Sequence, residues 1–123
     1  MKKIEISVVV PVYNASLNLK KLVEDLFNVL KTNYNSYELI LVNDKSLDDS
    51  WNIIVDLCKS YTWIKGIELR KNVGQHNAIL AGLKYAEGEA IITMDDDGQN
   101  SPKYIVDLCG EIKKAVMFVM PTI

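Results

Sequence analysis

Short apolar runs rich in β-branched residues alternate with longer amphipathic stretches, and this alternation constrains the fold more than any other feature. Strands are predicted over residues 4–10, 38–42, 64–69 and 89–94. Strands that alternate with helices form parallel sheets, because each crossover must return the chain to the start of the next strand. Such crossovers are right-handed. We therefore predict an α/β fold, with a mainly parallel sheet of four to five strands and helices on both faces.

The first predicted helix follows Asn18, a candidate N-cap, and reaches about residue 31. A fourth helix is predicted after Ser101, because Ser is a favoured cap and Pro102 suits the first helical position. The apolar residues of the first helix recur on one face: Leu19, Leu22, Val23, Leu26 and Leu30.

The second predicted helix runs to residue 60, and Ser46 and Asp49 precede it with the spacing of a capping box. Its expected buried stripe is Trp51, Ile54, Val55 and Cys58. The third helix is predicted from about Gln75, with Gly88 beyond its end. Its expected inward side chains are Ile79, Leu80 and Leu83.

Length and composition indicate one globular domain over residues 1–123, with no linker, repeat or low-complexity segment. The 14 Lys and Arg residues balance 16 Asp and Glu residues, for a net charge of -2, which argues against a nucleic-acid partner. The two cysteines, Cys58 and Cys109, lie in apolar helical patterns and are interpreted as buried thiols. Reduced thiols are typical of a cytoplasmic chain.

Membrane and secretory signals are not expected. No apolar run approaches the length of about 18 residues that a membrane-spanning helix needs. The basic start of the chain is followed by a short apolar stretch that carries Glu5 and ends at Pro11, unlike a secretory leader. The apolar tail at residues 115–123 is interpreted as a fifth strand in preference to a membrane anchor.

Polar side chains gather after the carboxyl end of each predicted strand. In open α/β sheets, ligands bind at that edge. For Asn43, Ser46 and Asn77 we retain a structural interpretation, because Asn and Ser favour turns and caps. The four clusters are Tyr13-Asn14, Asn43-Asp44-Lys45, Arg70-Lys71-Asn72 and Asp95 to Gln99.

The most informative cluster is Asp95-Asp96-Asp97, which follows the apolar run of the fourth strand. In an extended segment, Asp95 and Asp97 lie on one side and Asp96 on the other. Two carboxylates about 6 Å apart repel by roughly 3 kcal/mol at an effective dielectric of about 20, and a cation between them reverses that sign. Oxygen ligands suit Mg²⁺ or Mn²⁺, which take further ligands from substrate phosphates. The alternative is a solvated acidic turn that ends at Gly98.

Other common sites lack their residues. The six glycines do not form G-x-G-x-x-G or G-x-x-x-x-G-K-[ST], which argues against a bound dinucleotide and a Walker-type site. His76 is the single histidine, so a His-rich metal site is excluded. It lies in the first turn of the third predicted helix, where packing or capping and ligand contact are both open.

Several motifs, in order, resemble family 2 glycosyltransferases of the GT-A fold. They are Val8 to Asn14 (VVVPVYN), Leu41 to Asp44 (LVND), Arg70 to Gly82 (RKNVGQHNAILAG) and Thr93 to Pro102 (TMDDDGQNSP). The last two look most like polyprenyl-phosphate sugar transferases, such as dolichyl-phosphate mannose synthase and bacterial undecaprenyl-phosphate relatives. The resemblance covers roughly residues 4–110, and it implies a Rossmann-like half that binds a nucleotide sugar.

The resemblance implies roles for individual residues. Asp44 would accept a hydrogen bond from the base, and Asp95 and Asp97 would bind Mg²⁺ or Mn²⁺ and the donor diphosphate. Gln99 would lie beside the metal. The residues expected to contact the donor nucleotide are Pro11, Tyr13, Asn14, Asp44, Asn72, Asp95, Asp96 and Gln99.

The reaction implied is transfer of a sugar from a UDP- or GDP-linked donor to a polyprenyl phosphate or glycan, with inversion at the anomeric carbon. The acceptor-binding half of such enzymes lies beyond the matched segment. A full-length form would act in the cytoplasm or at the cytoplasmic face of the membrane. The apolar tail also makes a homo-oligomer plausible.

Two departures and two alternatives accompany this resemblance. Lys45 stands where the family usually has Gly, and Asp96 where a small residue is common. One alternative is a noncatalytic module that binds a nucleotide sugar. The other is a nucleotidyltransferase, which normally needs a glycine-rich basic loop after the first strand, and Tyr13 to Leu17 supplies none.

Overall fold

The computed structural model describes residues 3–94, which form a four-stranded sheet in the order β3-β2-β1-β4. All three strand pairings are parallel, as predicted. The order places β1 in the interior of the sheet and β4 beside it at one edge. The strands are β1 (Ile4–Val12), β2 (Tyr37–Asn43), β3 (Ile64–Glu68) and β4 (Gly88–Thr93).

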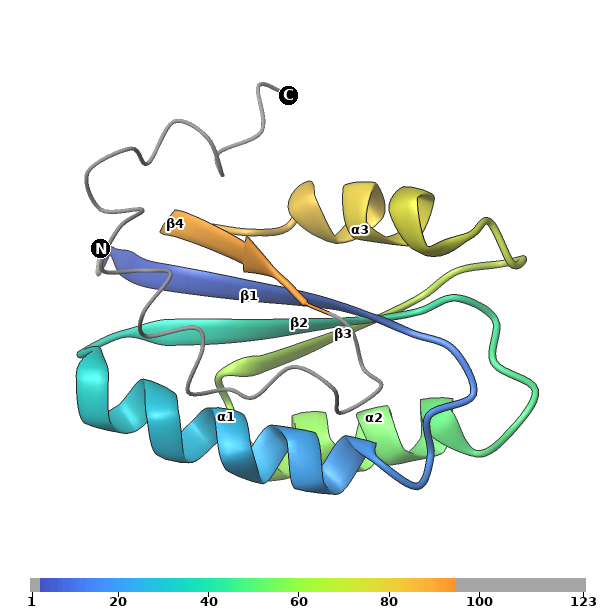
Figure 1. The fold of residues 1–123 in the computed structure, drawn as a ribbon, viewed down its shortest axis with the longest axis horizontal. Coiled ribbons are helices and arrows are strands. Elements are labelled where there is room, and N and C mark those ends of the chain that lie inside the picture. The colour runs from blue at the N-terminus through green and yellow to red at the C-terminus, as the bar shows by residue number, and fades with distance from the viewer. Residues whose placement is uncertain (1–2, 95–123) are drawn as a thin grey trace.

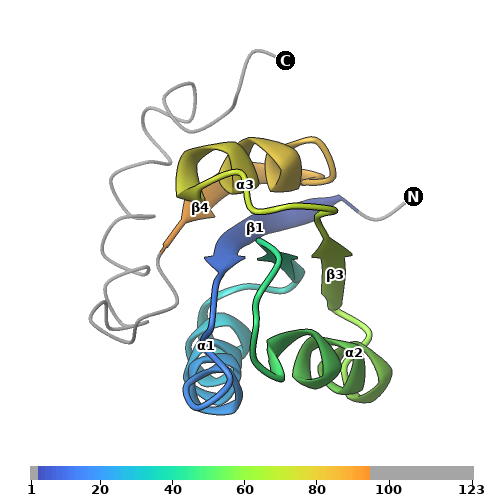
Figure 2. The ribbon, with the colours of Figure 1, turned by 90° about the vertical axis from the view of Figure 1, so that its right-hand side faces the viewer.

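Helices cover both faces of the sheet, which confirms the predicted layers (Figure 1). The helices are α1 (Leu19–Asn33), α2 (Ser50–Ser60) and α3 (Gln75–Leu83). α1 and α2 lie side by side on one face and α3 lies alone on the other, as Figure 2 shows end-on. The direction of the connections explains why α3 lies on the opposite face. The chain moves one way across the sheet from β1 to β3 and back past β1 to β4, and right-handed crossovers in opposite directions place their helices on opposite faces. Within the described residues, no helix is long and apolar enough to cross a membrane.

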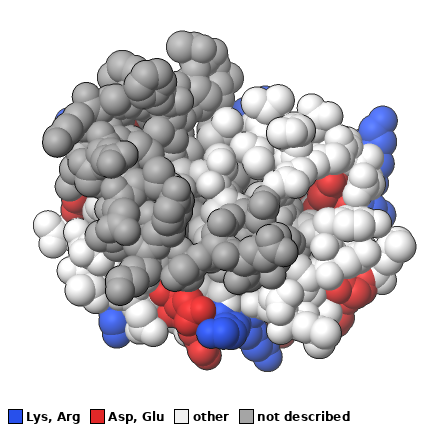
Figure 3. Space-filling view, in the orientation of Figure 1, with Lys and Arg blue, Asp and Glu red and all other residues white. Residues whose placement is uncertain are grey.

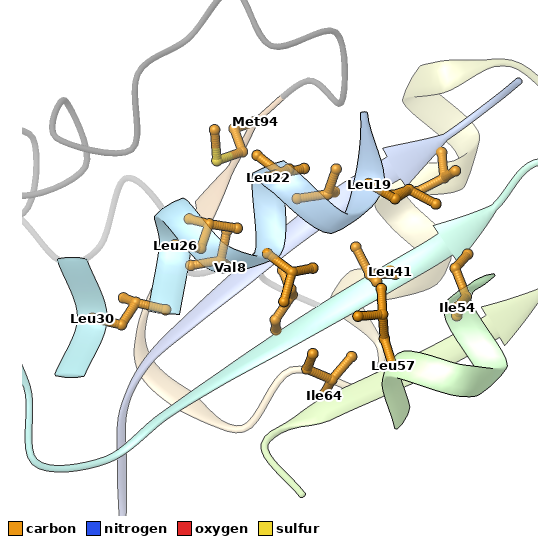
Figure 4. Packing of buried hydrophobic residues seen from close by; sticks show 14 of the residues in the cluster. Val8, Leu19, Leu22, Leu26, Leu30, Leu41, Ile54, Leu57, Ile64 and Met94 are labelled. Atoms are coloured by element: carbon orange, nitrogen blue, oxygen red, sulfur yellow. The ribbon is translucent and has the colours of Figure 1, made fainter. Parts of the chain in front are cut away.

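The main core lies between the sheet and the α1–α2 layer (Figure 4). All five side chains that the periodicity of α1 placed inward are buried. They pack against strand residues such as Val8 and Leu41, each 0% exposed. Burial of these aliphatic side chains is the main favourable term for the fold, at about 25 cal/mol per Å² of apolar surface.

Pro11 is compatible with an interior strand because β4 ends early. Val9 pairs with Thr93, and the Val9 carbonyl accepts a hydrogen bond from the Met94 amide. Pro11 has the same orientation as Val9, toward β4, but lies beyond the end of that strand. Its missing N–H therefore removes no bond of the sheet.

The smaller core under α3 differs from the prediction. Leu80 is 55% exposed, and the buried residues of the helix are Ala78 and Gly82. A Cβ atom on Gly82 would lie 2.6 Å from the Val9 side chain and 2.8 Å from Val42. α3 thus approaches the sheet through its small residues, which turns Leu80 outward. The expectation for Leu80 was wrong, whereas Ile79 and Leu83 are partly buried.

α2 also departs in detail from its predicted pattern. Ile54 is buried as expected, but Leu57 is its other buried apolar residue. Trp51, Val55 and Cys58 are only partly buried. Burial raises the pKa of the Cys58 thiol. The helix begins at Ser50, and Ser46 forms no cap on it, so the predicted capping box was wrong.

Several expectations fall beyond the part of the chain that the structure describes. They are the helix after Ser101, the burial of Cys109 and the fifth strand at residues 115–123.

Candidate functional site at the carboxyl edge of the sheet

The loops that follow β1, β2 and β3 meet at the carboxyl edge of the sheet, where the sequence placed its polar clusters (Figure 1). The β1–α1 loop and the β2–α2 loop are joined by hydrogen bonds, and so are the β2–α2 loop and the segment before α3. Three loops far apart in sequence therefore form one connected rim.

Asn14 connects the first two loops. Its amide donates to Ser46 Oγ at 3.0 Å, and its Oδ1 accepts from the Leu47 amide at 2.8 Å. Ser46 Oγ lies 2.5 Å from Asn43 Oδ1 and donates to it. Asn14 adopts φ of +51°, a left-handed conformation that Asn tolerates better than most residues. These contacts give Asn43 and Ser46 the structural role we expected.

Asp48 forms a second connection between the same loops. Its Oδ2 accepts from the Ser16 amide at 3.1 Å, and its Oδ1 accepts from the Ser50 hydroxyl at 2.5 Å and the Ser50 amide at 2.9 Å. Burial acts to raise the pKa of Asp48, but these hydrogen bonds outweigh it and lower the pKa to about 2. The carboxylate is therefore ionised at neutral pH and holds the start of α2.

Asp44 connects the β2 end to the segment before α3. The residue is 3% exposed, and its carboxylate oxygens accept from the Val73 amide at 2.8 Å and the Gly74 amide at 3.0 Å. Asn72 Nδ2 donates to the Asp44 carbonyl at 3.0 Å. Asp44 thus has two backbone partners within its own chain.

Lys45 adopts φ of +56°, in the region that favours glycine. The family pattern has Gly at this position, so a backbone requirement accounts for that preference. The exposed Lys45 side chain lies on the same rim as Asn14 and Asp44.

Two further predicted contact residues, the remaining residues of the third polar cluster and the single histidine differ in exposure. Pro11 is buried in β1, and Tyr13 follows β1 with its side chain exposed. Arg70 and Lys71 are exposed, and neither forms an ion pair with any residue between 3 and 94. His76 is exposed in the first turn of α3, so its packing interpretation was wrong.

The predicted metal ligands Asp95 and Asp97, together with Asp96 and Gln99, lie outside the described residues. Between residues 3 and 94, no three His, Cys, Asp or Glu side chains come together as metal ligands. The assignment of Mg²⁺ or Mn²⁺ to Asp95 and Asp97 stays a prediction from the sequence. β4 runs parallel to β1, so it leads toward the same carboxyl edge.

Charges of both signs are visible on one face of the described residues. On the face shown in Figure 3, Lys and Arg side chains lie next to Asp and Glu and form no extended basic patch. The nearest acidic and basic side chains on α1, Lys21 and Asp25, pair at 3.1 Å.

Sequence reasoning missed Ser16, Asp48 and Ser50 as parts of this rim. Asp48 lies two positions before Ser50, the first residue of α2, and an Asp side chain that accepts from the backbone two residues on is typical of helix starts. That local signal accounts for the bond from Asp48 to Ser50. Its bond to Ser16, 32 positions away, depends on the packing of β1 against β2 and has no local signal.

The chain is similar in sequence to known proteins. A sequence model described as glycosyl transferase family 2 matches residues 7–123. The undecaprenyl-phosphate 4-deoxy-4-formamido-L-arabinose transferase of Shewanella sediminis is 38% identical over 110 residues, which are 89% of this chain and 33% of that protein. The protein of the same description from Proteus mirabilis is 40% identical over 102 residues, 82% of this chain and 31% of its own length. The chain thus spans about a third of these relatives.

Solved structures share the fold. S. aureus TarS 1-349 in complex with UDP-GlcNAc superposes with a TM-score of 0.70 at 25% identity, over 90% of this chain and 32% of that one. Glucosyl-3-phosphoglycerate synthase from Mycobacterium tuberculosis, in complex with Mn²⁺ and UDP, superposes with a TM-score of 0.69 at 18% identity, over 88% and 39%. Both likenesses support the predicted GT-A architecture.

Proposed function

Because this chain belongs to glycosyl transferase family 2, we propose that it is the donor-binding part of an enzyme that transfers a sugar from a nucleotide diphosphate to an acceptor. The observation that carries the proposal is the convergence of three family-like motifs at one edge. The motif at the end of β1 is bonded to the loop after β2, and that loop is bonded to the motif before α3. This edge is where α/β sheets bind ligands.

The residues proposed to bind the donor form two groups at different places on the rim. Pro11, Tyr13 and Asn14 lie at the end of β1 and would contact the base and ribose. Asp44 and Asn72 would lie on the other side of the base. The TarS complex with UDP-GlcNAc and the Pyrobaculum calidifontis mannosyltransferase complex with GDP-Man and Mn²⁺ are similar in fold. They support a UDP- or GDP-linked sugar as the donor class.

The metal proposed is Mg²⁺ or Mn²⁺, held by Asp95 and Asp97, with Asp96 and Gln99 beside the diphosphate. When bound, such an ion neutralises the charge that develops on the leaving diphosphate. Asp95 and Asp97 would supply the oxygen ligands, and Arg70 and Lys71, which are exposed after β3, would supply positive charge. Two structural neighbours that contain Mn²⁺ support a divalent ion.

The acceptor and stereochemistry are proposed from the relatives. Both arabinose transferases are named for undecaprenyl phosphate, which supports a polyprenyl phosphate acceptor and a role in cell-envelope synthesis. A glycan is the alternative acceptor. We propose inverting transfer at the cytoplasmic face of a membrane, with the acceptor site in sequence that these residues do not include. Self-association of the chain remains a prediction.

Calorimetry of the chain with UDP-sugars and GDP-mannose tests donor binding. We expect binding with Mg²⁺ or Mn²⁺ and loss of binding with EDTA. Asp97→Asn should abolish the metal-dependent binding of the donor. Asp49→Asn makes the same charge change on the exposed residue before α2 and should leave the affinity for the donor unchanged. Affinity that EDTA does not alter would refute the metal assignment.

Transfer assays separate the proposed enzyme from the alternative of a noncatalytic binding module. We expect the 123-residue chain to bind donor with little or no transfer, and a longer form with an acceptor half to transfer sugar. In that form, Asp97→Ala should reduce turnover far more than stability. Donor binding without turnover in the longer form would favour the noncatalytic module.

A further inference from the structure

The segment from Leu69 to Gly74 is attached at one end to the last residue of β2 and at the other to the residue after it. At its start, the Leu69 amide donates to the Asn43 carbonyl at 3.0 Å. At its end, the amides of Val73 and Gly74 donate to the Asp44 carboxylate at 2.8 and 3.0 Å. Adjacent residues at the carboxyl end of β2, Asn43 and Asp44, therefore hold both ends of this segment, which we call the 69–74 loop.

We propose that Asp44 is a positioning residue that holds the 69–74 loop, with Arg70 and Lys71, at the donor site. The inference deepens the proposed function and rests on it for the identity of the ligand. Asp44 would act through the loop on the donor diphosphate, in addition to the contact with the base that the family resemblance implies.

The environment of Asp44 supports this role. Its side chain is almost completely buried, yet it forms no ion pair with any residue from 3 to 94. A buried carboxylate needs compensation, and hydrogen bonds to a charged acceptor are about twice as strong as neutral ones. The two backbone amides supply that compensation. The carboxylate and the loop thus stabilise each other.

The backbone at Gly74 shows that the attachment fixes a particular loop conformation. Gly74 has φ of +91°, and nothing lies within 4 Å of where its Cβ would be. The backbone angle therefore accounts for glycine at position 74, because a side chain there would meet no crowding. Asp44 accepts from this residue and from Val73, immediately before α3 begins. The carboxylate therefore also sets where α3 starts.

The consequence for a ligand concerns charge. Arg70 and Lys71 are exposed on the held loop and have no counter-ion among the described residues. A cation fixed in advance binds an anion without the entropy cost of ordering the loop. Diphosphate is the part of a nucleotide sugar that such cations attract. Loss of Asp44 should weaken binding of any diphosphate at this edge, with or without a base.

Hydrogen–deuterium exchange of the free chain tests the attachment without any ligand. We expect the Val73 and Gly74 amides to be protected in the wild type and to exchange about tenfold faster or more in Asp44→Asn. β1 amides should not change. Asp49→Asn is the charge-matched control and should leave both amides protected. Unprotected amides in the wild type, or equal acceleration throughout β1 in Asp44→Asn, would overturn the proposal.

Asn72→Ala provides a second variant in case Asp44→Asn does not fold. It keeps the carboxylate and removes only the bond from Asn72 Nδ2 to the Asp44 carbonyl. Because the carboxylate remains, we expect Val73 and Gly74 to stay protected in this variant. Loss of their protection in Asn72→Ala would contradict an attachment through the Asp44 carboxylate.

Affinities for Mn²⁺-UDP, Mn²⁺-GDP and Mn²⁺-pyrophosphate test the functional part. Asp44→Asn should weaken all three, and the loss for pyrophosphate, which contains no base, measures the part that acts through the loop. Weaker UDP binding with unchanged pyrophosphate binding would identify Asp44 as a base contact and refute the positioning role. Arg70→Gln should weaken pyrophosphate while Val73 and Gly74 stay protected. If the wild type binds none of the three, the proposed function fails, and exchange alone decides the attachment.

Discussion

Lys65 Nζ lies 2.8 Å from Oε1 of Glu38, a residue that is only 2% exposed. The other carboxylate oxygen accepts from the Ser7 hydroxyl at 2.6 Å and the Glu87 amide at 2.7 Å. Ser7 Oγ in turn accepts from the Gly88 amide at 2.8 Å. This buried network, at the edge opposite the candidate site, joins three strands to the start of β4.

Lys65→Met should destabilise the protein by about 1–2 kcal/mol, because it leaves a buried carboxylate without its cation. The expected loss is below the value for a fully buried pair, since Lys65 is itself 42% exposed. Lys21→Met is the matched control, because its pair with Asp25 is exposed and should contribute less than about 0.5 kcal/mol. Urea denaturation measures both, and equal losses would contradict a structural role for the network.

Stability should fall in acid through Glu38 and Asp48. Burial acts to raise the pKa of Glu38, but Lys65, Ser7 and the Glu87 amide outweigh it and lower the pKa below its ordinary 4.5. The pKa of Asp48 falls from 3.8 to about 2. A lowered carboxyl pKa stabilises the fold above the unfolded-state value, and that contribution is lost as pH falls through the folded-state value.

We therefore expect a constant free energy of unfolding from neutral pH to about 5, and a decline from about 4.5 toward 2. Asp48→Asn should reduce the decline below pH 4 specifically. A decline of the same size in the wild type and in Asp48→Asn would show that this carboxylate does not contribute.

Gly82→Ala should cost about 1–3 kcal/mol, although alanine favours helices, because the added methyl group would overlap the Val9 and Val42 side chains. Leu80→Ala on the same helix should cost much less, because its side chain is largely exposed. Thermal unfolding of both variants checks the packing of α3. A greater loss of stability for Leu80→Ala than for Gly82→Ala would instead support the inward position of Leu80 that the periodicity predicted.

Lys45→Gly and Asn14→Gly should have opposite effects, although both residues have positive φ. A left-handed conformation costs a residue other than glycine about 1–2 kcal/mol, and Lys45→Gly removes that cost. Glycine also makes the unfolded chain more flexible, so the free energy of unfolding should rise by at most about 1 kcal/mol. Asn14→Gly also removes the bond to the Leu47 amide and should lose about 1 kcal/mol. Denaturant midpoints with unchanged slopes would report these differences. Destabilisation by Lys45→Gly would contradict the strain argument.

Local patterns in the sequence were sufficient for the elements. β-branched runs predicted four strands, and the helical spacing from Leu19 to Leu30 predicted the buried face of α1. These signals are local because side chains repeat every two residues in a strand and about 3.6 in a helix. The same periodicity failed for Leu80, since the approach of α3 to the sheet depends on Gly82 meeting Val9 and Val42.

The sequence by itself determined that the polar clusters after β1, β2 and β3 lie at the carboxyl edge, because every strand of a parallel sheet ends there. Only the tertiary structure decided what those residues contact. Asp44 has hydrogen-bond partners about 30 positions away, and so do Asn14 and Asp48. Such bonds form only after β1, β2 and β3 have paired in register, and a local pattern cannot specify them because it contains one partner at a time.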